Sequence, residues 1–398
     1  MKHASLLDDI MALDVIDTHT HLVGDHLCAE DFWKIADYFW LNRELQTAGY
    51  PPEAEALPEE KRMEAFLKAY QSSRNTMMNI AFTTILKDLY GIELTDLASI
   101  RAADEQIKAN KTGSGWAQSV ADRLHVRRFV VNHPDHAAFE GMTHDALLFP
   151  RIDGWLPKLV QEIAQAEKRE EALEQAKAHI RKQLHEYHKL GCLGIMTTLS
   201  NYDAAAHEQY GINRETRSDE IMFMLLHEVC AELERLGMFL QLFLGVERRW
   251  GKTSAAPVND SLRVVRLYGL FERYSIPFEL VVASELNNLD VVQAAWNFPN
   301  VHVGGMWWYN FRASTYTQSM QYRLEALAPL KSSLIVSDAR CIEWTYGKLH
   351  VVKRLLAGFL DEQVSKGWID REGALYCASE WLCGSAANRY GLKGQEGL

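Results

Sequence analysis

The 398-residue sequence predicts an α/β protein, a (β/α)8 barrel of the TIM type, for three reasons. First, short apolar runs of strand length recur along the chain. Second, segments of helical length separate most of these runs, with a regular alternation from residue 192 onward. Third, the runs are apolar on both faces, as in a parallel sheet that is covered by helices. The runs are "DVID", "RRFVVN", "CLGIMTTL", "MFLQLFLGV", "FELVVAS", "VHVGGMWW" and "SLIVSDA". They account for seven strands, and the pattern does not locate an eighth.

A long, aromatic-rich and mainly helical stretch, residues 27–125, separates the first run from the second. It is too long for one crossover between neighbouring strands, so we expect an insertion over the barrel mouth. The chain contains no internal repeat and no linker rich in Gly, Ser or Pro. Residues 1–398 are therefore predicted to form a single barrel domain that carries this helical insertion.

The segment "KLVQEIAQAEKREEALEQAKAHIRKQLHEYHKL" predicts one long amphipathic helix before the strand run that begins at residue 192. Charges of both signs cover most of this helix, and we interpret them as a solvated face without a functional role. The apolar stripe consists of Leu159, Ile163, Ala166, Leu173, Ile180, Leu184 and Tyr187.

The composition excludes several classes of partner. The formal net charge is -11, and no run rich in Lys or Arg is present, which argues against a nucleic acid or an anionic membrane surface as partner. The N-terminal segment carries two aspartates where a signal peptide would need an apolar core, and no later stretch has the length of a membrane span. Six cysteines are scattered without a C-x-x-C pair, which is typical of reduced thiols. We therefore expect a cytoplasmic protein.

Two histidines follow the first strand run, in "DVIDTHTHLVGD". Alternate residues of a strand point to the same side, so His19 and His21 can offer both imidazoles to one point. At the C-terminal end of a barrel strand, this pair would lie where barrel enzymes place their chemistry. Taken alone, an H-x-H pair is more often two polar loop histidines than a metal site.

The words "DVIDTHTHL" resemble the first-strand metal motif of the amidohydrolase superfamily. The last strand run, "SLIVSDARCIEW", ends in Asp338, which corresponds to that superfamily's last-strand aspartate. The resemblance implies that His19, His21 and Asp338 hold one divalent metal ion, which we expect to be zinc, with Mn, Fe or Co as alternatives. The chain agrees with a single ion, because no lysine ends "CLGIMTTL" to bridge two metals. Phe243 also stands where many members of the superfamily have a ligand histidine.

A narrower resemblance is to the uronate (glucuronate) isomerase family of this superfamily. The segments "FPRID", "LQLFLGVERR", "VHVGGMWWYNF" and "SDAR" are similar to motifs of that family and occur in the same order along the chain. The resemblance implies that Asp338 and Arg340 are catalytic. It implies that a sugar acid is bound by Arg151, Arg248, Trp308, Asn310 and Tyr38. Arginines suit an acidic sugar because a guanidinium group can hold a carboxylate with two hydrogen bonds.

Three segments depart from the family pattern, namely "DYFWLNREL", "AFTTILKDLYGIEL" and "VVNHP". The first lacks the family's histidine, and the last replaces a pair of aspartates. The expected activity is a metal-dependent aldose–ketose isomerisation of a uronate or related sugar acid. The alternatives are a mononuclear hydrolase or lactonase, in which Asp338 deprotonates a water, and a sugar-acid binding protein without turnover. We expect a small-molecule substrate and a homo-oligomer.

Overall fold

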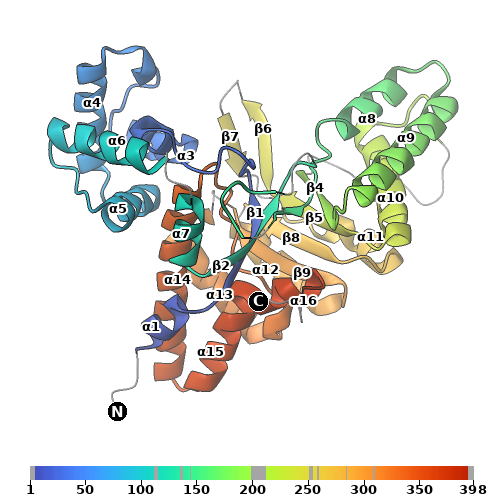
Figure 1. The fold of residues 1–398 in the computed structure, drawn as a ribbon. Coiled ribbons are helices and arrows are strands. Elements are labelled where there is room, and N and C mark those ends of the chain that lie inside the picture. Colours follow the sequence, from blue (N-terminus) through green and yellow to red (C-terminus); the bar gives the residue numbers. More distant parts are fainter. Residues whose placement is uncertain are drawn as a thin grey trace.

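The structure is a computed structural model, and it describes residues 5–111, 115–134, 138–143, 145–198, 212–250, 254–257, 260–283, 285–307 and 310–392. Parallel strands form its centre, and helices surround them and extend as two arms above the strands (Figure 1). Two groups of parallel strands run in sequence order, one of three strands and one of four. The first group is β1 (Val15–Thr20), β2 (Val126–Val131) and β3 (Leu147–Leu148). The second is β4 (Gly194–Thr198), β5 (Phe239–Leu244), β8 (Phe278–Val282) and β9 (Val301–Met306).

Hydrogen bonds join these two groups into a closed ring. Beyond β3, Arg151 forms a parallel bridge with Met196 of β4. On the other side, the extended segment 332–338 follows β9, with a parallel bridge between Val303 and Ser332. The same segment then reaches β1, where the backbone N–H of Asp338 donates to the carbonyl of His19 at 2.9 Å. Segment 332–338 thus serves as the eighth strand, and the predicted TIM-type barrel is confirmed.

The strand that the sequence pattern did not locate is β3. Its ladder comprises only Leu147 and Leu148, and Pro150 follows almost at once. Proline has no N–H to donate, so a regular ladder cannot continue through it. The remaining seven strand runs all lie in the barrel.

Between β1 and β2, within residues 27–125, the described part of the chain forms six α-helices. They are α2 (Phe32–Ala36), α3 (Phe39–Thr47), α4 (Glu59–Ser72), α5 (Met77–Tyr90), α6 (Leu97–Lys111) and α7 (Trp116–Asp122). Helices α3 to α6 form one arm of the molecule (Figure 1). Aromatic rings fill the interior of this arm, where Phe66 contacts Phe32, Tyr70 and Phe82. These rings belong to the same hydrophobic cluster as the barrel core, and Phe82 packs against Trp344 of the helix Ile342–Ser365.

The predicted long helix after "FPRID" is wrong, because the structure contains two helices there, α8 (Leu156–Gln165) and α9 (Arg169–Lys189). The guanidinium group of Arg169 donates to the carbonyl of Ala164 at the end of α8, and to the carbonyls of Asn213 and Thr216. These bonds satisfy a helix-end carbonyl and stabilise the break. Both helices pack against α10 (Ser218–Leu236), and the three together form the second arm (Figure 1).

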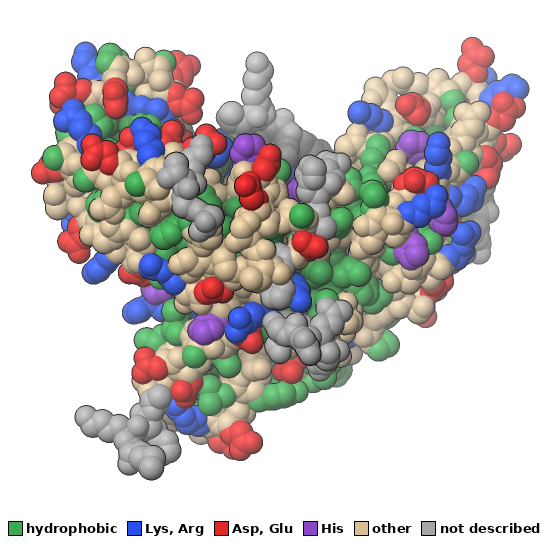
Figure 2. Space-filling view, in the orientation of Figure 1, with side chains coloured by type: hydrophobic (Ala, Val, Ile, Leu, Met, Phe, Trp, Pro, Cys, Tyr) green, Lys and Arg blue, Asp and Glu red, His purple; other side chains and the backbone are tan. Residues whose placement is uncertain are grey.

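The other helices surround the barrel. They are α1 (Leu6–Met11), α11 (Tyr268–Arg273), α12 (Glu285–Asn297), α13 (Ala313–Ala326), α14 (Ile342–Ser365), α15 (Arg371–Ser379) and α16 (Ser385–Arg389), and an antiparallel hairpin of β6 (Val246–Trp250) and β7 (Ser254–Pro257) follows β5. Near α16, Tyr390 packs with Ile16, Val130 and Phe149, which closes the N-terminal end of the barrel. Acidic and basic side chains intermingle over both arms on the face drawn in Figure 2. Among the described helices, none is both long enough and apolar enough to span a lipid bilayer.

Candidate metal centre and its surroundings

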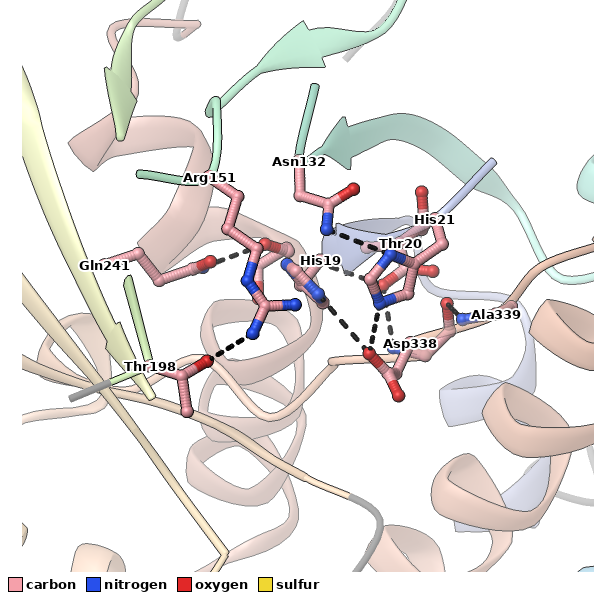
Figure 3. Close-up of polar contacts among 12 residues, drawn as sticks. His19, Thr20, His21, Asn132, Arg151, Thr198, Gln241, Asp338 and Ala339 are labelled. Atoms are coloured by element: carbon pink, nitrogen blue, oxygen red, sulfur yellow. Dashed lines mark hydrogen bonds and ion pairs between the residues drawn. The ribbon is translucent and has the colours of Figure 1, made fainter. Parts of the chain in front are cut away.

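Three side chains from the two ends of the chain meet at the C-terminal end of the barrel strands. His19 lies in β1, His21 follows it directly, and Asp338 ends the eighth strand. Nε2 of His19 lies 3.4 Å from Oδ1 of Asp338, and Nε2 of His21 lies 2.9 Å from the same oxygen. Figure 3 shows both imidazole rings directed at this carboxylate. The structure thus brings together the three residues that the sequence proposed as metal ligands.

The backbone of Asp338 holds its carboxylate in this position. Its φ of 52° is in the left-handed region, which residues other than glycine rarely adopt. Three hydrogen bonds fix the conformation. The Asp338 N–H donates to His19, the hydroxyl of Tyr38 donates to the Asp338 carbonyl at 3.0 Å, and the N–H of His21 donates to the carbonyl of Ala339 at 2.8 Å. A strained backbone that is held on several sides is typical of a functional position.

The electrostatics keep the carboxylate ionised and His19 neutral. Burial alone would raise the pKa of Asp338, but the charges and hydrogen bonds of His21 and His19 outweigh it and hold the pKa well below its ordinary value. Burial lowers the pKa of His19 to about 4. An ionised carboxylate and a neutral imidazole are the forms that bind a metal ion.

The donor set fits a divalent metal. One ligand atom from each of the three residues lies within 4.8 Å of the others. Nδ1 of His19 is buried and has no hydrogen-bond partner among the described residues, so this ring is not committed to a structural hydrogen bond there. Two imidazole nitrogens and one carboxylate oxygen suit Zn²⁺ and related ions, and they leave further coordination positions for water or substrate.

Asn132, which directly follows β2, contacts His21 from the side opposite Asp338. Nδ2 of Asn132 lies 2.9 Å from Nδ1 of His21 (Figure 3). In the sequence, "VVNHP" stands out only as a departure from the family pattern, and Asn132 was not among the predicted site residues. The available signal was its position, one residue beyond a barrel strand.

Arg151 lies beside the histidines and is held by its neighbours. Its Nε donates to Asp153 at 2.6 Å, and its Nη2 donates to Thr198 at 2.9 Å (Figure 3). Asp153 is in turn fixed by the N–H of Thr198 at 3.0 Å. The charge of Arg151 contributes to the lowered pKa of His19, which shows that its field reaches the site. The guanidinium group is therefore preoriented next to the candidate metal centre.

An apolar wall lines one side of the site. The ring of Phe243 in β5 packs on His19 with centroids 4.6 Å apart, and Trp307 packs edge-on against Phe243 at 5.1 Å. A phenyl ring at this position of β5 cannot bind a metal, so this strand supplies no ligand there. The wall also limits water around His19, in agreement with the burial that lowers its pKa.

A buried lysine from α14 lies behind the site, close enough to interact electrostatically with Asp338 and Asp17. Nζ of Lys348 donates to the carbonyl of Met306 at 3.3 Å. Burial lowers the pKa of Lys348 to about 7, although the charges of Asp338 and Asp17 act in the opposite direction. Asp17 is also buried, which raises its pKa to about 6, and it accepts the N–H of Ser337 at 2.9 Å. Lys348 was not among the predicted site residues, because a lysine within a helix is ordinarily solvated.

The other sequence candidates occupy different places. Arg340 is exposed, two residues beyond Asp338. Tyr38 is buried, packs at a tilt against Trp344 and donates through its hydroxyl to the Asp338 carbonyl, as described above. Asn310 is buried and donates to the carbonyl of Val282 at 2.7 Å. Trp308 and the side chain of Arg248 lie outside the described residues.

No protein-family model and no curated protein sequence matches the chain. Solved structures do match it. A uronate isomerase from Thermotoga maritima is similar with a TM-score of 0.78 and 16% identity, over 97% of this chain and 96% of that one. A glucuronate isomerase from Caulobacter crescentus is similar with a TM-score of 0.78 and 14% identity, over 98% and 94%. A protein from Lactobacillus casei assigned as a metal-dependent hydrolase follows, with a TM-score of 0.60 and 13% identity over 97% of both chains. The chain therefore has the fold of the uronate isomerases over nearly its whole length.

Proposed function

We propose that the protein is a metal-dependent aldose–ketose isomerase that acts on a uronate or a related sugar acid. One observation carries the proposal: a His19, His21 and Asp338 cluster at the C-terminal ends of the strands, in a barrel that matches uronate isomerases from end to end. Barrel enzymes hold their active sites at this face. The cluster would bind one divalent ion, which we propose to be zinc, with Mn, Fe or Co as alternatives.

The bound ion would polarise the substrate carbonyl and the neighbouring hydroxyl, which favours loss of the C2 proton. In the isomerisation, a proton leaves C2, a proton is added to C1, and the hydroxyl proton of O2 moves to O1. The carboxylate of Asp338 is ionised in the fold, so it can accept a proton. We assign the C2-to-C1 proton transfer to Asp338 or to a group that it contacts.

Two arginines would bind the negative charges of the substrate. Arg151 is preoriented by Asp153 and Thr198, and this arrangement reduces the entropy lost when the guanidinium group grips a carboxylate. Arg340 is exposed just beyond Asp338, where it can stabilise the oxyanion that develops on the open-chain sugar.

The remaining assignments follow from the same proposal. Arg248, Trp308, Asn310 and Tyr38 would complete the sugar-acid site. For Tyr38 and Asn310, the observed hydrogen bonds support an indirect contribution, because each fixes the backbone at the end of a barrel strand. The free cysteines support a reducing compartment, and we propose a cytoplasmic homo-oligomer.

A metal-dependent hydrolase or lactonase is the second candidate. It is favoured by the structural similarity to the Lactobacillus casei protein that is assigned as such a hydrolase. The same three side chains would then serve a different reaction, in which Asp338 takes a proton from the attacking water. No C–H bond of the substrate breaks in that reaction.

The fate of the C2 proton separates the two candidates. We would incubate the zinc-loaded protein in D2O with glucuronate, galacturonate and related acids, and follow ketose formation and C2 exchange by NMR. The isomerase should convert at least one acid to its ketose, with solvent deuterium in the product unless one shielded base returns the same proton. If no acid is isomerised or exchanged while a lactone or an acyl derivative is cleaved, the isomerase proposal fails and the hydrolase replaces it.

A further inference from the structure

His21 has a hydrogen-bond partner at each of its two ring nitrogens. Nδ1 faces Nδ2 of Asn132 at 2.9 Å, and Nε2 faces Oδ1 of Asp338 at 2.9 Å. A neutral imidazole carries one proton, so one nitrogen donates and the other accepts. A carboxylate oxygen at 2.9 Å can only accept from a ring nitrogen of this kind, so the proton belongs on Nε2. Nδ1 then accepts an N–H of the Asn132 amide, which agrees with the observed orientation of that amide.

A metal ion at the site requires the opposite tautomer. Nε2 must offer its lone pair to the ion, so the proton has to move to Nδ1 and needs an acceptor there. The carbonyl oxygen of Asn132 can take that role after a half-turn of the amide, which exchanges its nitrogen and oxygen. Asn132 can thus donate an N–H to one tautomer of His21 and accept the N–H of the other.

We propose that Asn132 is a positioning residue that holds His21 in both tautomers, as donor in the metal-free protein and as acceptor in the metal-bound protein. This inference rests on the proposed function, because it assumes that His21 is a metal ligand. It assigns a role to the asparagine of "VVNHP", one of the segments in which the sequence departs from the family it resembles.

The surroundings of Asn132 permit such a half-turn. Its backbone carbonyl accepts the N–H of Arg151 at 3.0 Å, so the neighbouring strand holds the main chain. Within the described part of the chain, the side-chain amide makes no hydrogen bond other than the one to His21. The side chain is only partly buried. Rotation of the amide would therefore break only the bond that it forms again with its other end.

Of the two proposed imidazole ligands, His21 is the one whose Nδ1 has a side-chain hydrogen-bond partner among the described residues. Nδ1 of His19 has no partner among the described residues, so Asn132 provides the observed side-chain support for the ligand pair from the side opposite the carboxylate. An aspartate at position 132 could only accept, so in the metal-free protein it would favour, together with the Asp338 carboxylate, a His21 ring protonated on both nitrogens. A leucine, which is of similar size, could stabilise neither form.

The test uses the full-length protein labelled with 15N-histidine, at a pH of about 8 so that ordinary imidazoles are neutral. Long-range 1H–15N NMR spectra report which nitrogen of His21 carries the proton, with and without Zn²⁺, and competition with a chelating indicator gives the zinc affinity. In the wild-type protein, we expect Nε2–H without zinc and Nδ1–H with zinc. Asn132→Leu should weaken zinc binding by about 10- to 100-fold, the usual effect of losing an outer-shell partner. Asn132→Asp should show both ring nitrogens of His21 protonated without zinc and only Nδ1–H with zinc.

The neighbouring residue His133 provides a matched control. Its ring nitrogen lies 3.0 Å from the carbonyl of Leu22, so His133→Leu removes a bond between the same loop and the end of β1 without touching the His21 ring. This variant should keep the wild-type tautomers and zinc affinity. If Asn132→Leu also keeps both while zinc binds to His21, the inference is overturned and the proposed function stands. If zinc binds to neither His19 nor His21 in the wild-type protein, the proposed metal-dependent function fails with it.

Discussion

His21 and Asp338 are 317 positions apart in the chain, yet Nε2 of the histidine lies 2.9 Å from Oδ1 of the aspartate. The contact joins the first strand of the barrel to the eighth, next to the point where the ring of strands closes. Both residues keep their positions through backbone hydrogen bonds across that same junction. The candidate metal centre is therefore a direct product of barrel closure.

Replacement of Asp338 tests whether its carboxylate is a ligand. Asp338→Asn should reduce the bound metal from about one ion per chain to a small fraction and abolish turnover, because the amide cannot supply an anionic oxygen. Elemental analysis after zinc reconstitution and gel filtration measures the metal content. Asp361→Asn, at an exposed position of α14, is the matched control and should keep its metal. Full zinc occupancy in Asp338→Asn would contradict the assignment.

Arg340 should matter for turnover without affecting the metal. Arg340→Met removes the charge that we place near the developing oxyanion, so kcat should fall by about 100-fold or more. The zinc content should remain that of the wild type. Arg354→Met changes an exposed arginine on α14 and should alter neither quantity. If zinc is lost from the Arg340 variant, the separation between ligand and substrate contact is incorrect.

Arg151 should act mainly on substrate binding. Arg151→Met should raise KM by about 10- to 100-fold with a smaller change in kcat, since a carboxylate is gripped in both the ground state and the transition state. Asp153→Asn should raise KM less, because it loosens the guanidinium group without removing it. Arg181→Met is the matched control. Arg181 pairs with Glu228 at 2.7 Å within the arm formed by α8, α9 and α10, so this variant should have unchanged kinetics. An unchanged KM in Arg151→Met would exclude it from the substrate site.

Glu343 should contribute to stability by joining the insertion to the barrel. Its buried carboxylate accepts the N–H of Ala29, the hydroxyl of Tyr90 and the indole N–H of Trp116. Glu343→Gln places an amide N–H against one of these donors, so unfolding in denaturant should become easier by about 1–3 kcal/mol. Glu362→Gln, an exposed change on the same helix, should cost far less. Equal midpoints for the two variants would show that this contact is dispensable.

His302 should make stability depend on pH. Burial lowers its pKa from 6.5 to about 2, and the charges of Arg389 and Lys331 act in the same direction. Below pH 6.5, the unfolded chain therefore binds a proton at His302 that the folded protein does not bind. The contribution to stability is complete above pH 6.5 and declines as the pH falls toward 2.

A denaturation series of His302→Gln between about pH 4 and 6 tests this prediction. The variant should show a pH slope of the unfolding free energy that is shallower by up to about 1.4 kcal/mol per unit, the value for one proton. His26→Gln, at an exposed histidine, should keep the wild-type slope. Parallel slopes for all three proteins would contradict a neutral His302.

The sequence predicted the ligand cluster because two short local motifs, the H-x-H pair and the aspartate that ends the last apolar run, resemble those of a known superfamily. The alternation of a strand and the geometry of a barrel then explain how these side chains meet. The third strand was missed for a local reason as well, since Leu147 and Leu148 are too few to give a strand signal before Pro150. A sequence pattern predicts a strand only when the strand is long enough to show several apolar residues in a row.

Other features depend on contacts that no local pattern contains. The break between α8 and α9 is stabilised by Arg169, whose partners include Asn213 and Thr216. Lys348 is buried because the neighbouring barrel strand offers it the carbonyl of Met306. Asn132 acquires a role only through its distance to His21. In each case, residues far apart in sequence determine the environment.

The closure of the ring by segment 332–338 also bears on the order in which the chain folds. During synthesis from the N-terminus, β1 and β9 each present an unpaired edge until this last strand is made and inserts between them. Its contacts with β1 close a loop of more than 300 residues, among the costliest in entropy that the chain forms. The candidate ligand set is completed in the same step, so a metal ion held by these three residues would bind only after the barrel has closed.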